Sequence, residues 1–154
     1  MNRIKLKIAG LCLLLLASTN LARFDFTAPM QKASEKDIHC LAQNIYHEAR
    51  SEPLGGQIAV AQVTVNRVKA SNFTKSVCRV VFEPHQFSWT ANRHLRVKDS
   101  KAWKASLVIA KAVLTNSIRL PNFTATHYHT KSVNPRWNRN MQVLAIIGHH
   151  IFYA

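Results

Sequence analysis

The sequence predicts a single compact α+β domain that is mainly helical and carries a small β element. Its 154 residues suit one domain of ordinary size. Hydrophobic residues make up 47% of the chain and charged residues 18%, so the chain can bury a core and is not disordered throughout. Three stretches show helical periodicity or helix-favouring composition, and one stretch near the C-terminus alternates in polarity as a strand does.

Residues 1–22 have the pattern of a secretory signal peptide. Three basic residues precede an apolar run from Ile8 to Ala17. That run is short for a bilayer span, which needs about 20 apolar residues. Cleavage after Ala22 would leave 23–33 as a lead-in segment and 34–154 as the folded domain, with no membrane span. We therefore expect a secreted or periplasmic protein, although a retained anchoring N-terminus is the alternative.

The first helix of the domain is predicted to begin at Ser34. Ser34-Glu35-Lys36-Asp37 is a capping-box pattern, in which the Ser hydroxyl accepts from a free backbone N–H and the acids favour the helix start. Apolar residues then recur on one helical face: Ile38, Leu41, Ala42, Ile45 and Ala49. Pro53, followed by two glycines, ends this helix.

The next segments mix helical and extended signals. Residues 57–68 are rich in β-branched residues yet also fit a helical stripe, and the Pro-x-Gly-Gly entry before them favours a helix. Residues 76–82 form a short apolar stretch that leads into a loop over 83–89.

The second half of the chain contains the predicted strand. Asp99 or Ser100 is expected to cap a helix from about 101 to 116. Residues 123–130 alternate in polarity and predict a strand, and 141–153 are a last apolar segment.

The chain is strongly basic. Lysine and arginine total 21 against 7 acidic residues, a formal charge of +14. Removing 1–22 leaves 18 basic and 7 acidic residues, a charge of +11. Such a balance favours an anionic partner, either nucleic acid, a membrane surface or an acidic polymer. The basic residues are scattered and match no nucleic-acid-binding motif, so with export we expect no nucleic acid partner.

Two cysteines remain after signal removal, Cys40 and Cys78. In an oxidising compartment they could form a disulfide, and the alternative is two buried free thiols. Neither belongs to a C-x-x-C pair, which argues against redox catalysis and a cysteine-rich zinc site.

Glu48 is the leading candidate for catalysis. It falls at the edge of the apolar stripe of the first helix, where partial burial would raise its pKa toward that of a useful general acid. The alternative is a surface glutamate paired with a cation. Glu52, four residues on, could be its carboxylate partner or could brace the turn at Pro53. Glu83 is the only other acid near a polar-aromatic loop.

Histidines and aromatic residues surround the predicted strand. His127 and His129 share one strand face, which suggests zinc, although no zinc-binding helix motif accompanies them and a polar substrate wall is favoured. Aromatic rings in or beside these polar segments could stack on sugars or fill the core. They are Tyr46, Phe87, Trp89, Tyr128 and Trp137.

Ordered sequence blocks run through residues 38–153. The first contains Tyr46-His-Glu-Ala-Arg50, and Asn66-Arg67 follows it. Later blocks are Ser76–Phe82, Gln86-Phe-Ser-Trp89, Thr126-His-Tyr-His129, Val133-Asn-Pro-Arg-Trp137 and Ile147–Tyr153. Together they resemble the SleB-like cell wall hydrolases, named for the bacterial spore-cortex-lytic enzymes. Ser51 departs from the family pattern, which usually has glycine there.

The resemblance implies a peptidoglycan hydrolase of mixed α+β fold. It implies one essential glutamate on the first helix, as in lytic transglycosylases and lysozymes, and that position is Glu48. We expect a substrate cleft past Glu48, with these substrate-binding residues: Glu52, Gln86, Trp89, Tyr128 and His129. We expect no metal or other cofactor, and a monomer that binds peptidoglycan and holds anionic wall polymers by electrostatics.

The predicted reaction is cleavage between N-acetylmuramic acid and N-acetylglucosamine by lytic transglycosylation. A single convincing catalytic carboxyl favours this over classical hydrolysis, which uses two. One alternative is a zinc-dependent N-acetylmuramoyl-L-alanine amidase with His127, His129 and His149 as ligands. Another is a cationic wall-binding protein without catalysis.

Overall fold

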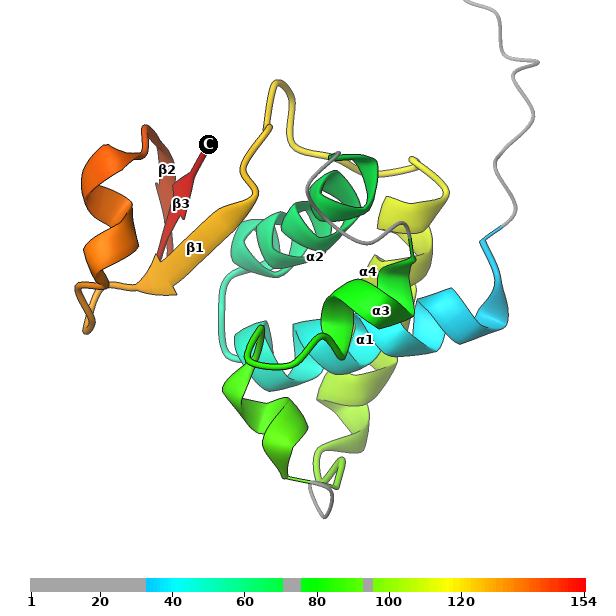
Figure 1. Cartoon of the computed structure of the whole chain (residues 1–154). Helices are drawn as coiled ribbons and strands as arrows, with labels where there is room; N and C mark the ends of the chain where they lie inside the picture. Colours follow the sequence, from blue (N-terminus) through cyan, green and yellow to red (C-terminus); the bar gives the residue numbers. More distant parts are fainter. Residues whose placement is uncertain (1–32, 71–75, 93–95) are drawn as a thin grey trace, which may run out of the picture.

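The α1 helix (Glu35–Ala49) is the centre of the helical part of the molecule. It packs against α2 (Leu54–Lys69), α3 (Val77–Val81) and α4 (Ser100–Leu114), as Figure 1 shows for the computed structural model. The structure describes residues 33–70, 76–92 and 96–154. The predicted signal peptide and residues 23–32 of the lead-in segment lie outside them. Among the described residues, no helix is long and apolar enough to cross a membrane.

The helix starts follow from local capping chemistry. The Ser34 hydroxyl accepts a hydrogen bond from the backbone N–H of Asp37 at 3.0 Å, and the Asp99 carboxylate accepts from that of Ala102 at 2.9 Å. The predicted starts of α1 and α4 are therefore confirmed. Residues 57–68 are helical, as predicted, and belong to α2.

A disulfide joins α1 to α3. Cys40 and Cys78 are bonded, with their Cα atoms 5.2 Å apart. Of the two possibilities that the sequence left open, the structure contains the disulfide.

A small antiparallel sheet covers one side of the helices. Its strands are β1 (His127–Thr130), β2 (Val143–Ile147) and β3 (His150–Tyr153), in the order β1-β3-β2. In the β1–β3 register, His127 lies opposite Tyr153 and Thr130 opposite His150. The predicted α+β class is confirmed, and the last apolar segment forms the β2–β3 hairpin.

The predicted strand over 123–130 is wrong in its first half, because only 127–130 pair with another strand. The carbonyls of Phe123 and Ala125 instead accept hydrogen bonds from the Asn66 side chain at 3.0 and 2.9 Å. Polar side chains of α2 thus take the place of a neighbouring strand. Phe123 and Ala125 are buried, which explains the alternation seen in the sequence.

Two apolar clusters hold these parts together. The first lies among the four helices and includes Leu41, Ile45 and Val81. The second lies between α2 and the sheet and includes Val63 and Phe152. Two 3-10 helices complete the described chain: η1 (Ser88–Ala91), and η2 (Arg136–Asn140) between β1 and β2.

Candidate active site

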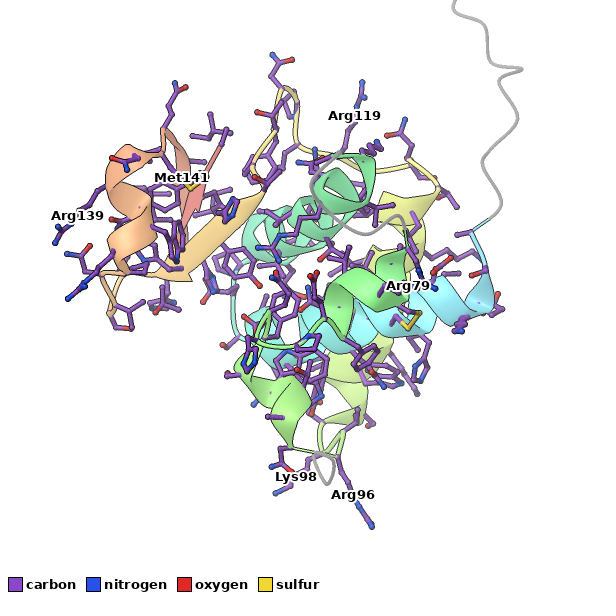
Figure 2. The ribbon with its side chains drawn as sticks, viewed as in Figure 1. Arg79, Arg96, Lys98, Arg119, Arg139 and Met141 are labelled. Atoms are coloured by element: carbon purple, nitrogen blue, oxygen red, sulfur yellow. A yellow bond between two sulfur atoms is a disulfide. The ribbon has the colours of Figure 1, made fainter. Side chains whose placement is uncertain are left out.

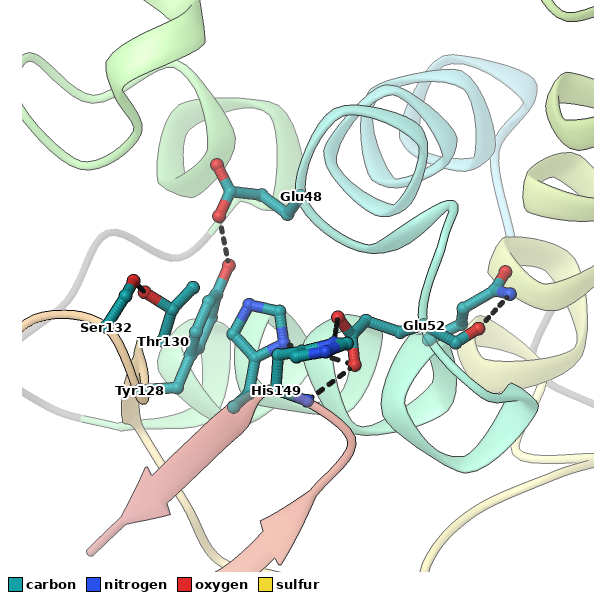
Figure 3. A network of polar contacts seen from close by, with 8 residues as sticks. Glu48, Glu52, Tyr128, Thr130, Ser132 and His149 are labelled. Atoms are coloured by element: carbon teal, nitrogen blue, oxygen red, sulfur yellow. Dashed lines mark hydrogen bonds and ion pairs between the residues drawn. The ribbon is translucent and has the colours of Figure 1, made fainter.

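Glu48 lies in the last turn of α1 and faces the sheet. Its Oε2 accepts a hydrogen bond from the Tyr128 hydroxyl at 3.1 Å (Figure 3). Burial raises the pKa of Glu48, whereas the Tyr128 hydrogen bond, the charge of Arg67 and the indole N–H of Trp89 lower it, and the net pKa stays above the ordinary value. A carboxyl with a raised pKa holds its proton to higher pH than an ordinary glutamate does, as a general acid requires.

Arg67 is a buried cation beside this carboxyl. Only 6% of its surface is exposed. Its Nε donates to the carbonyl of Thr126 at 2.6 Å, and its Nη1 donates to Gln86 Oε1 at 2.9 Å. The guanidinium thus links α2, the loop before η1 and the segment entering β1. Its charge acts on Glu48 and favours the ionised carboxylate.

Aromatic rings form a wall beside the carboxyl. Trp89 stacks on His47, with ring centroids 4.6 Å apart, and on Phe87 at 6.3 Å. Its buried indole N–H lowers the pKa of Glu48. Its distance and angle to every acceptor in the described chain nevertheless fall outside those of a hydrogen bond. Burial and the charge of Glu48 raise the pKa of Tyr128 well above its usual range, so Tyr128 remains a donor.

Glu52 holds a turn. Its side chain is only 5% exposed, and both carboxylate oxygens contact His149. Oε2 accepts a hydrogen bond from the backbone N–H of His149 at 2.9 Å, and Oε1 lies 3.0 Å from the ring Nδ1. Figure 3 shows Glu52 directed to this turn and Glu48 to Tyr128. Burial raises the pKa of Glu52, but the His149 hydrogen bonds and the histidine charges outweigh burial and lower it. The carboxylate thus secures the β2–β3 turn, whereas the sequence suggested that it would pair with Glu48 or brace the turn at Pro53.

His129 lies on the other face of the sheet from Tyr128. Its ring stacks on Tyr153, with centroids 5.2 Å apart, and its Nε2 lies 2.7 Å from the Tyr153 hydroxyl. The structure therefore gathers Gln86, Trp89 and Tyr128 around Arg67 and Glu48. It places Glu52 and His129 elsewhere. Substrate binding by each of the five residues stays a prediction.

The histidines of the amidase alternative do not converge. His127 and His129 lie beside Trp137, with ring centroids 5.4 and 5.6 Å from it, whereas His149 contacts Glu52. Within residues 33–70, 76–92 and 96–154, no three His, Cys, Asp or Glu side chains come together as a metal site would require.

Two residues of the site, Arg67 and His47, are not among those predicted from the sequence. The signal for Arg67 was present, because it shares a helical stripe with Val60, Val63 and Thr64, all of which are buried. An arginine on such a stripe needs a carboxylate or carbonyl partner. His47 gave no comparable signal, since its stacking on Trp89 depends on where η1 folds back.

Comparison with known proteins decides the family. The Cell Wall Hydrolase family model matches residues 51–153, about two thirds of the chain. The chain belongs to the cell wall hydrolase family. Glu48 lies just before the matched segment.

Relatives of this cell wall hydrolase include spore cortex-lytic enzymes. That of Bacillus cereus is 29% identical over 77% of this chain and 44% of its own length. That of Oceanobacillus iheyensis is 32% identical over 79% of this chain and 43% of its own length. The chain thus spans less than half of the length of these relatives.

Two solved structures share the fold. The crystal structure of the catalytic domain of the Bacillus cereus SleB protein superposes with a TM-score of 0.66 at 30% identity, covering 80% of this chain and 94% of that one. The catalytic domain of a germination-specific lytic transglycosylase, SleB from Bacillus anthracis, gives the same TM-score and identity over 80% and 98%. The family resemblance noted from the sequence is confirmed.

Proposed function

We propose that this cell wall hydrolase acts on peptidoglycan, cleaving the bond between N-acetylmuramic acid and N-acetylglucosamine by lytic transglycosylation. Glu48 serves as the single acid and base. The observation that carries the proposal is the environment of Glu48, a half-buried carboxyl with a raised pKa, a tyrosine donor and a buried arginine. The lytic transglycosylase named among the similar structures supports the same reaction.

In this mechanism Glu48 first gives its proton to the glycosidic oxygen. The bond from C1 of the muramic acid to that oxygen breaks, and positive charge develops at C1. The Glu48 carboxylate, stabilised by Arg67 and held by Tyr128, then takes the proton of the sugar's own 6-hydroxyl as that oxygen closes on C1. The products are a 1,6-anhydromuramic end and a free N-acetylglucosamine 4-hydroxyl, and no water is consumed.

Two other carboxylates bear on whether a second carboxyl takes part, and only one of them is engaged elsewhere. Glu52 is engaged by the β2–β3 turn, so it is not available as a base. Glu83 is the second candidate, because its charge acts on Arg67, as that of Glu48 does. Its Oε2 is buried without a hydrogen-bond partner in the described part of the chain. Hydrolysis with Glu83 as the base is therefore the competing function.

Mass spectrometry of digested sacculi tests the proposal. We expect anhydromuramic ends from the wild-type protein and from Glu83→Gln, and no release of fragments by Glu48→Gln. Reducing muramic ends that disappear in Glu83→Gln would establish hydrolysis instead. Equal lysis by wild type and Glu48→Gln would overturn the enzymatic proposal and favour a non-catalytic cationic protein.

Chelation separates the amidase alternative. We expect full glycan-cleaving activity after EDTA treatment and no released stem peptides. Loss of activity with EDTA, restored by zinc, together with free stem peptides, would establish an amidase. The substitution His149→Ala adds a second test, since an amidase that used His149 as a ligand would lose zinc.

The wall is the proposed location of this activity. Positive charge would concentrate the enzyme on anionic wall polymers through many weak contacts that salt screens. We expect binding to sacculi to weaken steadily as the salt concentration rises.

A further inference from the structure

We propose that the side of the sheet facing away from Glu48 binds a second stretch of peptidoglycan. The surface consists of Trp137 with Lys131, Arg136 and Arg139, and we call it the outer surface. The identity of the polymer rests on the proposed function; the existence of the surface does not.

Alternation along β1 separates this surface from the candidate active site. Tyr128 points toward Glu48 and packs on Phe152, with ring centroids 5.6 Å apart. His127 and His129 point the other way and contact Trp137, at 5.4 and 5.6 Å. The outer surface and the candidate active site thus lie on opposite faces of β1.

Trp137 is an exposed ring on a rigid support. It retains 41% exposure although it also packs edge-on against Tyr153, with centroids 5.5 Å apart. The next residue, Asn138, donates to Asn134 Oδ1 at 3.0 Å and lies 3.2 Å from His129 Nε2. These bonds fix η2 on the sheet, so the indole is held in place without a substrate.

The charge of the chain segment that carries this ring is of one sign. Residues 100–154 contain seven lysines and arginines and no aspartate or glutamate. Arg136 and Arg139 are three residues apart in a 3-10 helix, which places them on the same side of η2. Both are exposed, as is Lys131. Figure 2 shows Arg139 directed outward from this end of the molecule, whereas Arg79 and Arg119 lie over the helices.

An exposed indole on the same short helix as two exposed arginines fits a sugar polymer that bears carboxylates. The indole face can stack on the apolar face of a sugar ring, as aromatic side chains do. The cations can pair with the carboxylates of the stem peptides. A phosphodiester polymer would use the arginines but would gain nothing from Trp137 unless it carried sugar rings. Peptidoglycan supplies both chemistries.

Binding to sacculi by a Glu48→Gln protein tests the surface without catalysis. The sacculi are stripped of attached phosphodiester polymers, and Kd is measured at low and moderate salt. We expect Arg136→Gln/Arg139→Gln to weaken binding about tenfold. The matched control, Arg79→Gln/Arg119→Gln, removes the same charge from the helical side and should change binding less than twofold. Trp137→Ala should weaken binding several-fold.

Four outcomes would overturn the proposal. Equal losses for the two double variants would show diffuse attraction only. Unchanged binding by Trp137→Ala would exclude stacking. Binding that disappears when sacculi are stripped would assign the surface to the phosphodiester polymers. The fourth outcome combines three results. If Trp137→Ala loses binding and has a lowered Tm, while Arg136→Gln/Arg139→Gln binds with an unchanged Kd, then Trp137 serves packing and not binding.

The test of the surface and the test of the proposed function are independent. Fragment release by the wild-type protein from the same sacculi reports on catalysis alone. If no fragments are released but the binding losses follow the predicted pattern, the proposed reaction fails and the surface stands.

Discussion

In the proposed reaction one carboxyl first gives a proton and then takes one back, so its surroundings must stabilise both the protonated and the ionised form. At Glu48, burial favours the protonated form, whereas Arg67 and the Tyr128 hydroxyl favour the ionised form. Burial outweighs them and raises the pKa, and in the proposed reaction the cation and the donor are in place when the proton leaves. These two partners come from α2 and β1.

Removing the Tyr128 hydroxyl should move the pH profile upward. That hydrogen bond lowers the pKa of Glu48, so the pKa should rise in Tyr128→Phe. The proposed acid step needs protonated Glu48, and the alkaline limb of kcat/KM should therefore shift to higher pH. We also expect kcat to fall about tenfold, because the carboxyl loses its orienting contact.

The matched control is Tyr153→Phe, whose hydroxyl contacts His129 on the other sheet face. Its alkaline limb should match that of wild type. A limb at the wild-type pH in Tyr128→Phe would contradict the role given to Tyr128.

The substitution Glu48→Gln should stabilise the fold at neutral pH. The pKa of Glu48 is raised by folding, so the folded state binds its proton more tightly than the unfolded state does. Stability is therefore lost as pH rises from the ordinary glutamate pKa through the folded pKa. Glutamine stays neutral, and its Tm should exceed that of wild type at pH 7. The difference should vanish below pH 4, and a constant difference at every pH would contradict this account.

At the level of single residues, sequence periodicity predicts Glu48 because the border of an apolar stripe is a local property. Arg67 gives a comparable signal on α2, because it shares a helical stripe with buried residues. The pairing of Tyr128 with Glu48 spans 80 residues and depends on how the sheet docks. No pattern within the predicted strand distinguishes Tyr128 from His129 as the residue that faces the acid.

Among the elements, the β2–β3 turn depends on a single glycine. Gly148 has φ +58°, and a Cβ there would collide with Oε2 of Glu52. Ser51, by contrast, is absent from the residues with positive φ, so the family's glycine at that position is not needed for its backbone here.

Gly148→Ala should destabilise the protein by about 2–4 kcal/mol. The substitution strains the backbone and displaces a buried carboxylate from its donors. Gly55→Ala is the control, since its Cβ would meet Ile147 Cγ2 at an ordinary 3.8 Å and alanine favours the helix. Urea denaturation should show it neutral or up to about 1 kcal/mol more stable. Equal effects of the two substitutions would exclude a role for the turn.

Helices were easier to predict than strands here because capping and periodicity are local. The segment 123–126 alternates like a strand, but its carbonyls bond to an α2 side chain 57 to 59 residues away in sequence. A sequence pattern indicates which side chains are buried. It does not indicate which groups form hydrogen bonds with the backbone N–H and C=O groups.

At the scale of the whole molecule, one covalent link ties the helical part together. The Cys40–Cys78 disulfide closes a separation of 38 residues, which should stabilise the fold by about 2–4 kcal/mol. We expect reduction, or Cys40→Ser/Cys78→Ser, to lower Tm and to leave kcat nearly unchanged at low temperature. The reductant should not affect the double variant. An unchanged Tm on reduction would contradict the prediction.

The bond between Glu52 and the backbone of His149 joins residues 97 positions apart. On a ribosome, the helix that bears the acid emerges long before the turn that secures the sheet beneath it. Until that turn arrives, Tyr128 has no fixed place against Glu48, and the nascent chain carries its reactive carboxyl without the groups that tune it. The proposed lytic activity would therefore require the finished polypeptide, and an interrupted product would lack it.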